Sequence, residues 1–482
     1  MSTAAAFAPP VPPRTPAGLP PRAHTPVWLL LLWGAAGVAT LVFLPVAGLG
    51  AAAAAVMSGG AFLAMGTWGV RLLARGDRVF STRLFTGAFL ARYVVALLVS
   101  AAVLLSGLPG LKGGKDYISW EAGGWAVAEA WRSGTLSVYL VDSDPGYYYL
   151  IGAVYTITGR VPIAPTLLNG LFGAGAAVVA FFLAMRLYDR RTGVVAGMLA
   201  AFLPNLLVWS SLLYKDVVLS FFVAATVYCA IEVYHAPTRR WVVLLGLSLV
   251  PLFMIRPESA MTLVSVTALL ITLAGRRRGS KLAALVAAGG MVLLLLVVLQ
   301  AAGLAGKLDL IAKFRNPLAA ATNAREVWAD EVGARATGLS RYLYGKNLLL
   351  SPHLLLVALV MPFLLPLPGS AGLEMSITAF LMPGQVVWLL LLPAILFGAV
   401  SALGRGTTPP HLYVVGVIGA LVLGVAVAGY FSNPRYLVQG VPVMMVLAAH
   451  GVGAVRRRLL VYLSMLMGVM VVFCLYGLVQ GL

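Results

Sequence analysis

Residues 107–144 read GLPGLKGGKDYISWEAGGWAVAEAWRSGTLSVYLVDSD, and long apolar runs precede and follow them. Charged residues make up only 10% of the 482-residue chain, yet this stretch holds five of its 15 carboxylates. They are Asp116, Glu121, Glu129, Asp142 and Asp144. A polar loop between apolar runs is typical of a segment held at a membrane surface. We therefore expect this acidic loop to carry the chemistry of the protein.

Most of the remaining chain is apolar. Hydrophobic residues make up 61% of the sequence, against about 45–50% in soluble domains. Runs of about 20 apolar residues predict transmembrane helices, because lipid offers the backbone no hydrogen-bond partner. The sequence thus predicts an all-α polytopic membrane protein with about 13–14 transmembrane helices. The runs are approximately 27–47, 49–70, 86–106, 163–187, 193–212, 217–234, 241–255, 258–274, 282–304, 347–367, 378–402, 411–431, 437–454 and 459–480.

The chain divides into a tail and one membrane domain. Residues 1–26 are rich in Pro and Ala and predict a disordered cytoplasmic tail. Residues 27–482 form a single predicted domain, interrupted by the acidic loop 107–144 and the polar loop 305–346. The segment 145–158 is too short to span a bilayer. Counting spans from the N-terminus places loop 305–346 outside and counting from the C-terminus places it inside; we expect it outside.

Arginine clusters predict which ends of the helices face the cytoplasm, because short cytoplasmic loops collect Lys and Arg. The clusters lie at residues 71–83, 190–191, 239–240, 276–278 and 456–458. With these inside, the acidic loop shares the opposite face with the turns at 214–216, 255–258 and 433–436. Anionic headgroups explain the net charge of +19 better than nucleic acid does. We expect a multi-pass protein of the plasma (inner) membrane with its site on the extracytoplasmic face.

Asp116 is the first candidate catalytic residue. It precedes residues 119–133, whose apolar side chains recur at helical spacing and include Trp120 and Trp131. This pattern predicts a short helix lying in the membrane interface, with tryptophans at headgroup level. An aspartate held there can act as a general base on an acceptor hydroxyl. The alternative is a helix cap or a solvated loop charge.

Asp216 is the second candidate catalytic residue. It follows Tyr214 and Lys215 and immediately precedes the apolar run 217–230. A carboxylate at the mouth of a span is unfavourable unless it is solvated or paired. A simple ion pair or cap involving Lys215 would also explain it. The functional interpretation is favoured because Asp216 is predicted to share a face with Asp116.

Arg256 interrupts the apolar stretch 244–273 and is followed by Glu258. A guanidinium matches phosphate oxygens with a planar fork of donors. Arg256 is therefore the main candidate for binding a lipid phosphate, with Lys215 and Arg435 as further candidates. The alternative is a snorkelling arginine paired with Glu258.

The remaining polar motifs are weaker. Glu258, Tyr147 and Tyr436 are candidate substrate-binding residues, although the tyrosines at 147–149 also suit an interfacial belt. Asp142-Ser143-Asp144 is similar to the DxD metal motif of nucleotide-sugar transferases, but a turn before Pro145 explains it adequately. The histidines are scattered without ligand spacing. We predict no metal and no cofactor, and nothing in the sequence supports a divalent ion.

Several motifs occur together in a familiar order. An aspartate in the first outer loop leads into a helix ending in glycine (Asp116 through Gly134), followed by Pro-Gly-Tyr-Tyr-Tyr at 145–149. Next come Asn169, Arg186-Leu187-Tyr188, Gly193, Ala201 to Pro204, Trp209-Ser210 and Asp216, and much later Pro434-Arg435-Tyr436-Leu437 and Pro442. This order resembles the GT-C membrane glycosyltransferases, in particular the protein O-mannosyltransferase and aminoarabinose transferase group. The resemblance covers about residues 110–275 and, loosely, 430–455.

The resemblance implies a GT-C-like bundle with an interfacial helix in the first large outer loop. It implies a sugar donor linked to polyprenyl phosphate, an acceptor on the outer face, and inversion at the anomeric carbon. By position, Asp116 matches the first-loop catalytic aspartate and Asp216 the second-loop aspartate, while Arg256 matches a basic residue near the lipid phosphate. The chain departs from the pattern in two extra spans before the acidic loop and in having no soluble domain after the last span, so the acceptor (glycan, lipid or protein) stays open.

The resulting hypothesis is a glycosyltransferase in which Asp116 accepts the acceptor's proton and Arg256 stabilises charge on the departing phosphate. One alternative is a polysaccharide polymerase that uses lipid-pyrophosphate oligosaccharides. A second is a non-enzymatic lipid or sugar transporter, which predicts inverted repeats and ionisable residues at mid-membrane. A catalytically inactive scaffold is a third.

Overall fold

The computed structural model describes residues 25–73, 77–106, 114–136, 145–272, 375–404, 408–427 and 435–455, with isolated positions between 283 and 297. Every element in these residues is a helix, so the predicted all-α class is confirmed. The polar loop 305–346, the spans predicted at 347–367 and 459–480, and nearly all of the predicted tail lie outside the described residues. The helices are α1 (Val27–Leu73), α2 (Arg78–Ser106), α3 (Gly114–Arg132), α4 (Gly146–Thr158), α5 (Ile163–Leu187), α6 (Arg190–Phe202), α7 (Pro204–Ser210), α8 (Lys215–His235), α9 (Arg239–Ile255), α10 (Pro257–Thr272), α16 (Met375–Ala402), α17 (Pro409–Val427), α18 (Arg435–Val438) and α19 (Val441–Val455).

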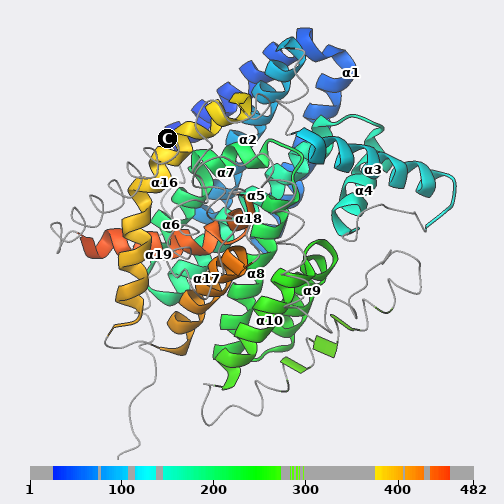
Figure 1. Ribbon diagram of the computed structural model, residues 1–482. Coiled ribbons are helices and arrows are strands. Elements are labelled where there is room, and N and C mark those ends of the chain that lie inside the picture. Colours follow the sequence, from blue (N-terminus) through cyan, green and yellow to red (C-terminus); the bar gives the residue numbers. More distant parts are fainter. Residues whose placement is uncertain are drawn as a thin grey trace, which may run out of the picture.

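Helix α5 lies in the middle of the bundle (Figure 1), and α1, α2, α4, α6, α7, α8 and α19 all pack against it. Small residues on its buried faces, such as Gly170, Gly173 and Ala177, let these neighbours approach closely, as is common between membrane helices. Within the described residues, α1, α2, α5 and α8 are long and apolar enough to cross a membrane, and the bent pair α6–α7 makes a fifth. The protein is therefore an integral, multi-pass membrane protein.

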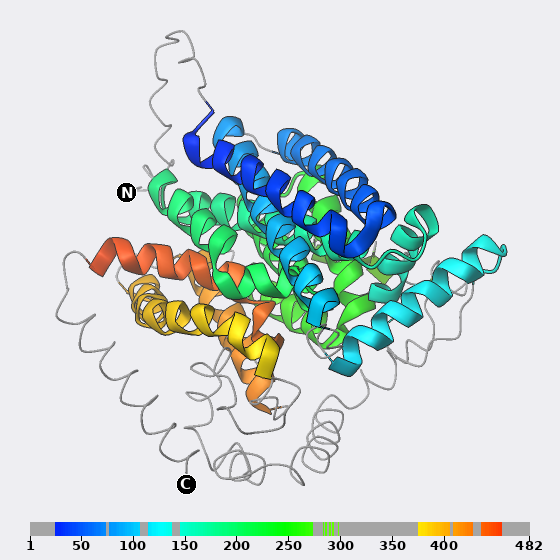
Figure 2. The same cartoon turned by 90° about the horizontal axis from the view of Figure 1, so that it is seen from above.

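Helix α1 contains 47 residues, which would extend for about 70 Å if it were straight, more than twice the hydrocarbon thickness of a bilayer. It is broken at Gly48, whose φ of 83° lies in the left-handed region that glycine adopts without strain. The chain turns sharply there (Figure 2). The break separates the two runs that the sequence predicts as individual spans, 27–47 and 49–70.

A second break separates α6 from α7, where the sequence predicts one continuous span. The two helices meet at an angle of 51° next to Pro204. The last carbonyls of α6 lose their helical partners there, and the buried guanidinium of Arg92 on α2 takes their place. Its Nη1 donates to the carbonyl of Ala201 at 2.8 Å and its Nη2 to that of Ala200 at 3.2 Å. A positive charge also complements the negative end of the α6 dipole.

Helices α3 and α4 pair along their length, and α3 extends beyond the rest of the bundle in both views (Figures 1 and 2). Two arginines hold the pair together. Arg160 makes a bidentate ion pair with Glu121 on α3, with both N–O distances 2.9 Å. Arg132 donates to the carbonyl of Tyr155 on α4 at 2.6 Å. The predicted interfacial helix is therefore present as α3, and it begins five residues earlier than the periodicity indicated.

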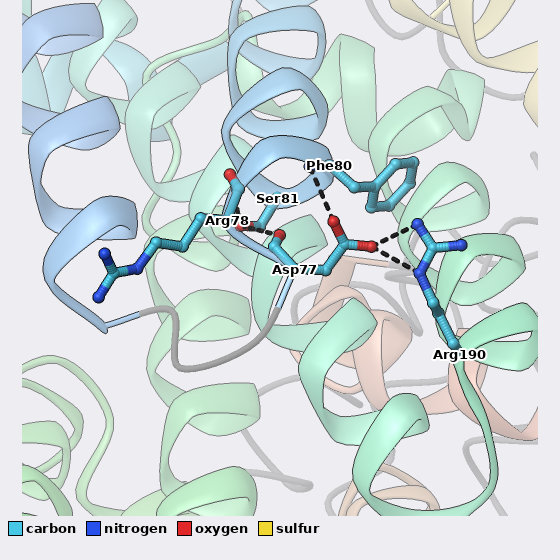
Figure 3. A network of polar contacts seen from close by, with 5 residues as sticks. All are labelled: Asp77, Arg78, Phe80, Ser81 and Arg190. Carbon is cyan, nitrogen blue, oxygen red and sulfur yellow. Dashed lines mark hydrogen bonds and ion pairs between the residues drawn. The ribbon is translucent and has the colours of Figure 1, made fainter. Parts of the chain in front are cut away.

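The opposite end of the bundle carries its own charged network (Figure 3). The carboxylate of Asp77 accepts from the backbone N–H of Phe80 at 3.2 Å, which caps α2, and forms an ion pair with Arg190 at the start of α6. On the same end, Arg186 pairs with Glu232 at 3.0 Å and joins the ends of α5 and α8. The described arginines of the clusters at 71–83, 190–191 and 239–240 thus lie at one end, as the sequence predicts, and Arg240 donates to the carbonyl of Leu73 there at 3.3 Å. The clusters at 276–278 and 456–458 lie outside the described residues.

Candidate functional site

The site lies at the other end of α8, where two non-helical turns meet. Asp216 lies in the first turn of α8. Arg256 is the residue between α9 and α10. Its Nη1 lies 3.6 Å from Oδ1 of Asp216, and the two side chains are only 12% and 1% exposed. The structure therefore brings together the two turns that the sequence predicts to share a face.

The carboxylate of Asp216 is buried. Among the residues that the structure describes, neither of its oxygens has a hydrogen-bond partner. Two favourable charges compensate for its burial, namely Arg256 and the positive end of the α8 dipole. A buried carboxylate with unused acceptor capacity is an energetically demanding group, and such groups concentrate at functional sites.

Lys215 and the turn before it contact the interfacial helix α3. The Nζ of Lys215 lies 5.9 Å from the centre of the Trp120 ring. The same ring makes edge contacts with Tyr147 at 5.4 Å and with Tyr214 at 5.2 Å. Trp120 thereby connects α3 and α4 to the turn that carries Asp216.

Asp116 belongs to the first turn of α3, but its side chain lies outside the described residues. Position 116 is four residues, or about one helical turn, before Trp120, so the two positions share one face of α3. Since Trp120 contacts Tyr214, the backbone arrangement supports a location for residue 116 near the Asp216 turn. The catalytic role of Asp116 stays a prediction.

Tyr147 is 1% exposed, so it does not form an open surface. Its hydroxyl lies 3.0 Å from Nδ2 of Asn169 on α5 and 3.3 Å from the Oδ1 of the same amide. Burial raises the pKa of Tyr147 well above its ordinary value, the hydrogen bond with Asn169 opposes that rise, and the negative charge of Asp216 adds to it. Tyr147 is therefore a neutral buried donor near Asp216, and its role in substrate binding stays a prediction.

The C-terminal part of the chain joins the site through α18. The hydroxyl of Ser259, three residues after Arg256, donates to Oε1 of Gln439 at 2.7 Å. Helix α18 also packs against α8. Arg435 and Tyr436 open α18, although their side chains lie outside the described residues. Glu258 lies in the first turn of α10 and is exposed, whereas its neighbours Pro257 and Ser259 are buried.

Two buried polar residues of this region were not predicted as functional from the sequence. Asn169 binds the turn before Asp216, and Arg92 caps α6. Each is a polar side chain inside an apolar run, which is a recognisable signal in a membrane protein. Among the described residues, no three His, Cys, Asp or Glu side chains gather closely enough to hold a metal ion. The residues 142–144 lie outside the described part.

Comparison with known proteins gives a family match. Residues 142–301 match the family described as dolichyl-phosphate-mannose-protein mannosyltransferase. This stretch is similar to membrane mannosyltransferases. It covers about a third of the chain, contains both Asp216 and Arg256, and confirms the resemblance that the motifs indicate. No curated protein matches this chain in sequence.

Solved structures of ArnT from Cupriavidus metallidurans share 15% identity with the chain. The structure bound to undecaprenyl phosphate has a TM-score of 0.43 over 74% of this chain and 60% of that one. The apo structure has a TM-score of 0.42 over 74% and 59%. The chain therefore spans about 60% of the length of these proteins.

Proposed function

We propose that this protein is a glycosyltransferase that moves a sugar from a polyprenyl-phosphate donor to an acceptor hydroxyl on the extracytoplasmic face of the plasma (inner) membrane. The observation that carries the proposal is the buried pair of Asp216 and Arg256, 3.6 Å apart where two distant turns meet. The family match supports it, because the matched stretch includes both residues. The acceptor can be a glycan, a lipid or a protein.

In this proposal the cationic groups hold the donor phosphate. The side chain of Arg256 is 12% exposed and lies 3.6 Å from Asp216. In this proposal the donor phosphate approaches the exposed part of Arg256, and Asp216 helps to fix its position. Lys215 is adjacent in sequence, and Arg435 opens the helix that packs on α8. A planar guanidinium suits phosphate oxygens, and its charge opposes the negative charge that grows on the leaving phosphate.

The chemical step is a single displacement with inversion. The acceptor oxygen attacks the anomeric carbon, its proton passes to Asp116, and the bond from that carbon to the phosphate oxygen breaks. The products are the glycosylated acceptor and polyprenyl phosphate. Asp216 keeps Arg256 oriented toward the phosphate, and Glu258, Tyr147 and Tyr436 are the candidate contacts to the substrates. The protein's own cations can stabilise a leaving monophosphate, so the step as proposed uses no metal.

The test uses the full-length protein in nanodiscs. Binding of polyprenyl phosphate is measured first, because it requires no knowledge of the sugar or acceptor. Arg256→Gln is expected to weaken binding about tenfold or more, since it removes the cation that binds the phosphate. Asp216→Asn is expected to weaken binding less, because it removes the contact that orients Arg256 but also a negative charge that repels the phosphate. Glu232→Gln is the matched control, because it removes a carboxylate from an ion pair at the other end of the same helix, α8.

Transfer is then measured with labelled sugars on polyprenyl phosphate and, separately, on polyprenyl pyrophosphate. Release of labelled sugar from the monophosphate donor supports the proposal. Use of only the pyrophosphate donor would indicate a polymerase instead. If polyprenyl phosphate binds equally well to the wild type, Arg256→Gln and Glu232→Gln, the proposed site is wrong.

A further inference from the structure

The amide of Asn169 holds the non-helical turn in front of Asp216. Asn169 lies near the start of the transmembrane helix α5 and is completely buried. Its Nδ2 donates to the carbonyl of Leu212 at 2.7 Å and to that of Tyr214 at 3.0 Å. Every hydrogen bond of its side chain therefore reaches another segment of the chain.

This turn has limited hydrogen bonding of its own. Residues 211–214 connect α7 to α8 without helical structure. Within the turn the carbonyl of Leu212 accepts from the N–H of Tyr214 at 3.0 Å, and the amide of Asn169 adds a bond to that carbonyl from another helix. Tyr214 is the N-cap residue of α8 and makes no side-chain cap. The amide of Asn169 thus fixes the backbone at the point where α8 begins.

Asp216 depends on that backbone. Its carboxylate accepts no hydrogen bond from any described residue, and its contact with Arg256 is an ion pair of 3.6 Å rather than a directional bond. A side chain without hydrogen bonds of its own is placed mainly by its main chain. A shift of the start of α8 would therefore move the carboxylate relative to Arg256.

We infer that Asn169 is a positioning residue that sets the distance between Asp216 and Arg256 by anchoring the turn 211–214 to α5. The catalytic part of this inference rests on the proposed function, whereas the anchoring part does not. A displacement of about 1 Å by a change away from the chemistry can lower a rate about 100-fold. A substitution of Asn169 should therefore lower turnover more than it weakens donor binding, because Arg256, the residue proposed to bind the donor, is unchanged.

The test compares Asn169→Leu with Thr226→Val in the full-length protein in nanodiscs. Thr226 is the matched control, because its hydroxyl also makes a buried hydrogen bond between helices, to Ser248 at 2.9 Å, and it lies on α8, the helix that carries Asp216. The first readout is hydrogen exchange of the amides at 211–218. The second is the split between kcat and the KM for the donor. Asn169→Ser, which keeps one hydroxyl donor, replaces Asn169→Leu if that variant does not fold.

We expect Asn169→Leu to speed exchange at 211–218 about tenfold and to lower kcat about 10- to 100-fold, with KM changed less than threefold. Thr226→Val should leave exchange at 211–218 and the kcat unchanged even where it lowers the melting temperature equally. Wild-type exchange at 211–218 in both variants would overturn the inference. Faster exchange in a protein whose wild type transfers no sugar would retain the anchor and reject the proposed function.

Discussion

The ion pair between Asp216 and Arg256 makes a prediction about stability that is independent of any substrate. At 3.6 Å and an effective dielectric constant of about 20, two unit charges attract by about 4 to 5 kcal/mol. Desolvation of both groups offsets part of this energy. We expect a coupling energy of about 1–3 kcal/mol between the two side chains, because both are almost completely buried.

The assay is a double-mutant cycle with Asp216→Asn, Arg256→Gln and the double variant, with unfolding followed by denaturant titration from mixed micelles. The pair Arg186–Glu232 provides a matched cycle, since it also joins an arginine to a carboxylate, at 3.0 Å, and involves the same α8. Its side chains are 39% and 14% exposed, so water and salt screen it more strongly. We expect about 0–1 kcal/mol for that control pair.

The two cycles together decide the question. A coupling energy for Asp216 and Arg256 below about 0.5 kcal/mol, or equal to that of the control pair, would refute the buried ion pair. In that case the mutual position of the two turns, and the proposed phosphate site with it, would lose its physical basis. A double variant more stable than either single variant would be consistent with the buried pair, because it leaves no uncompensated charge.

Three further predictions concern other parts of the chain. Asp116→Asn should lower the transfer rate by about 10²–10⁴ while polyprenyl phosphate still binds, and a wild-type rate would exclude Asp116 as the base. Arg92→Met should destabilise the protein by about 3 kcal/mol or more, measured by the same denaturant titration, because it leaves the carbonyls of Ala200 and Ala201 buried without a donor. Burial, with the nearby charge of Glu121, raises the pKa of Tyr117 to about 12 from an ordinary value of about 10. The unfolded chain therefore loses this proton first, so stability should fall as the pH rises from about 10 to 12; Tyr117→Phe should flatten that decline, and an unchanged slope would contradict the burial.

The sequence predicts the spans well where an apolar run is uninterrupted. Helix α5 has the predicted bounds, because its run at 163–187 is apolar apart from Thr166, Asn169 and Arg186. At 193–212 the sequence predicts one continuous span, whereas the structure has a pair of helices bent by 51°, which is long and apolar enough together to make one span. The apolar composition of this run does not reveal the break. Arg92 makes the break favourable, and it lies on α2, about 100 residues earlier in the chain.

The site was predicted in outline through arginine clusters. They placed the turns of Asp216 and Arg256 on one face, and the structure brings these side chains within 3.6 Å. The pattern could not indicate that the carboxylate of Asp216 accepts no hydrogen bond from the described residues, or that Asn169 bonds to the turn before it. Both facts depend on how the helices pack. For the same reason, the sequence grouped Tyr147 with surface residues, whereas its hydroxyl is inside the bundle.

The arginine that caps α6 has a consequence for biosynthesis. With 13 residues, α6 is only about 20 Å long, too short to cross a bilayer by itself. The carbonyls of Ala200 and Ala201 would lack their donor, Arg92, unless α2 were already inserted beside them. Membrane integration should therefore proceed in order: α2 inserts first, and α6 packs against it when it is made. A chain that lacks α2 should fail to keep the α6–α7 segment in place, and quality-control proteases should degrade it.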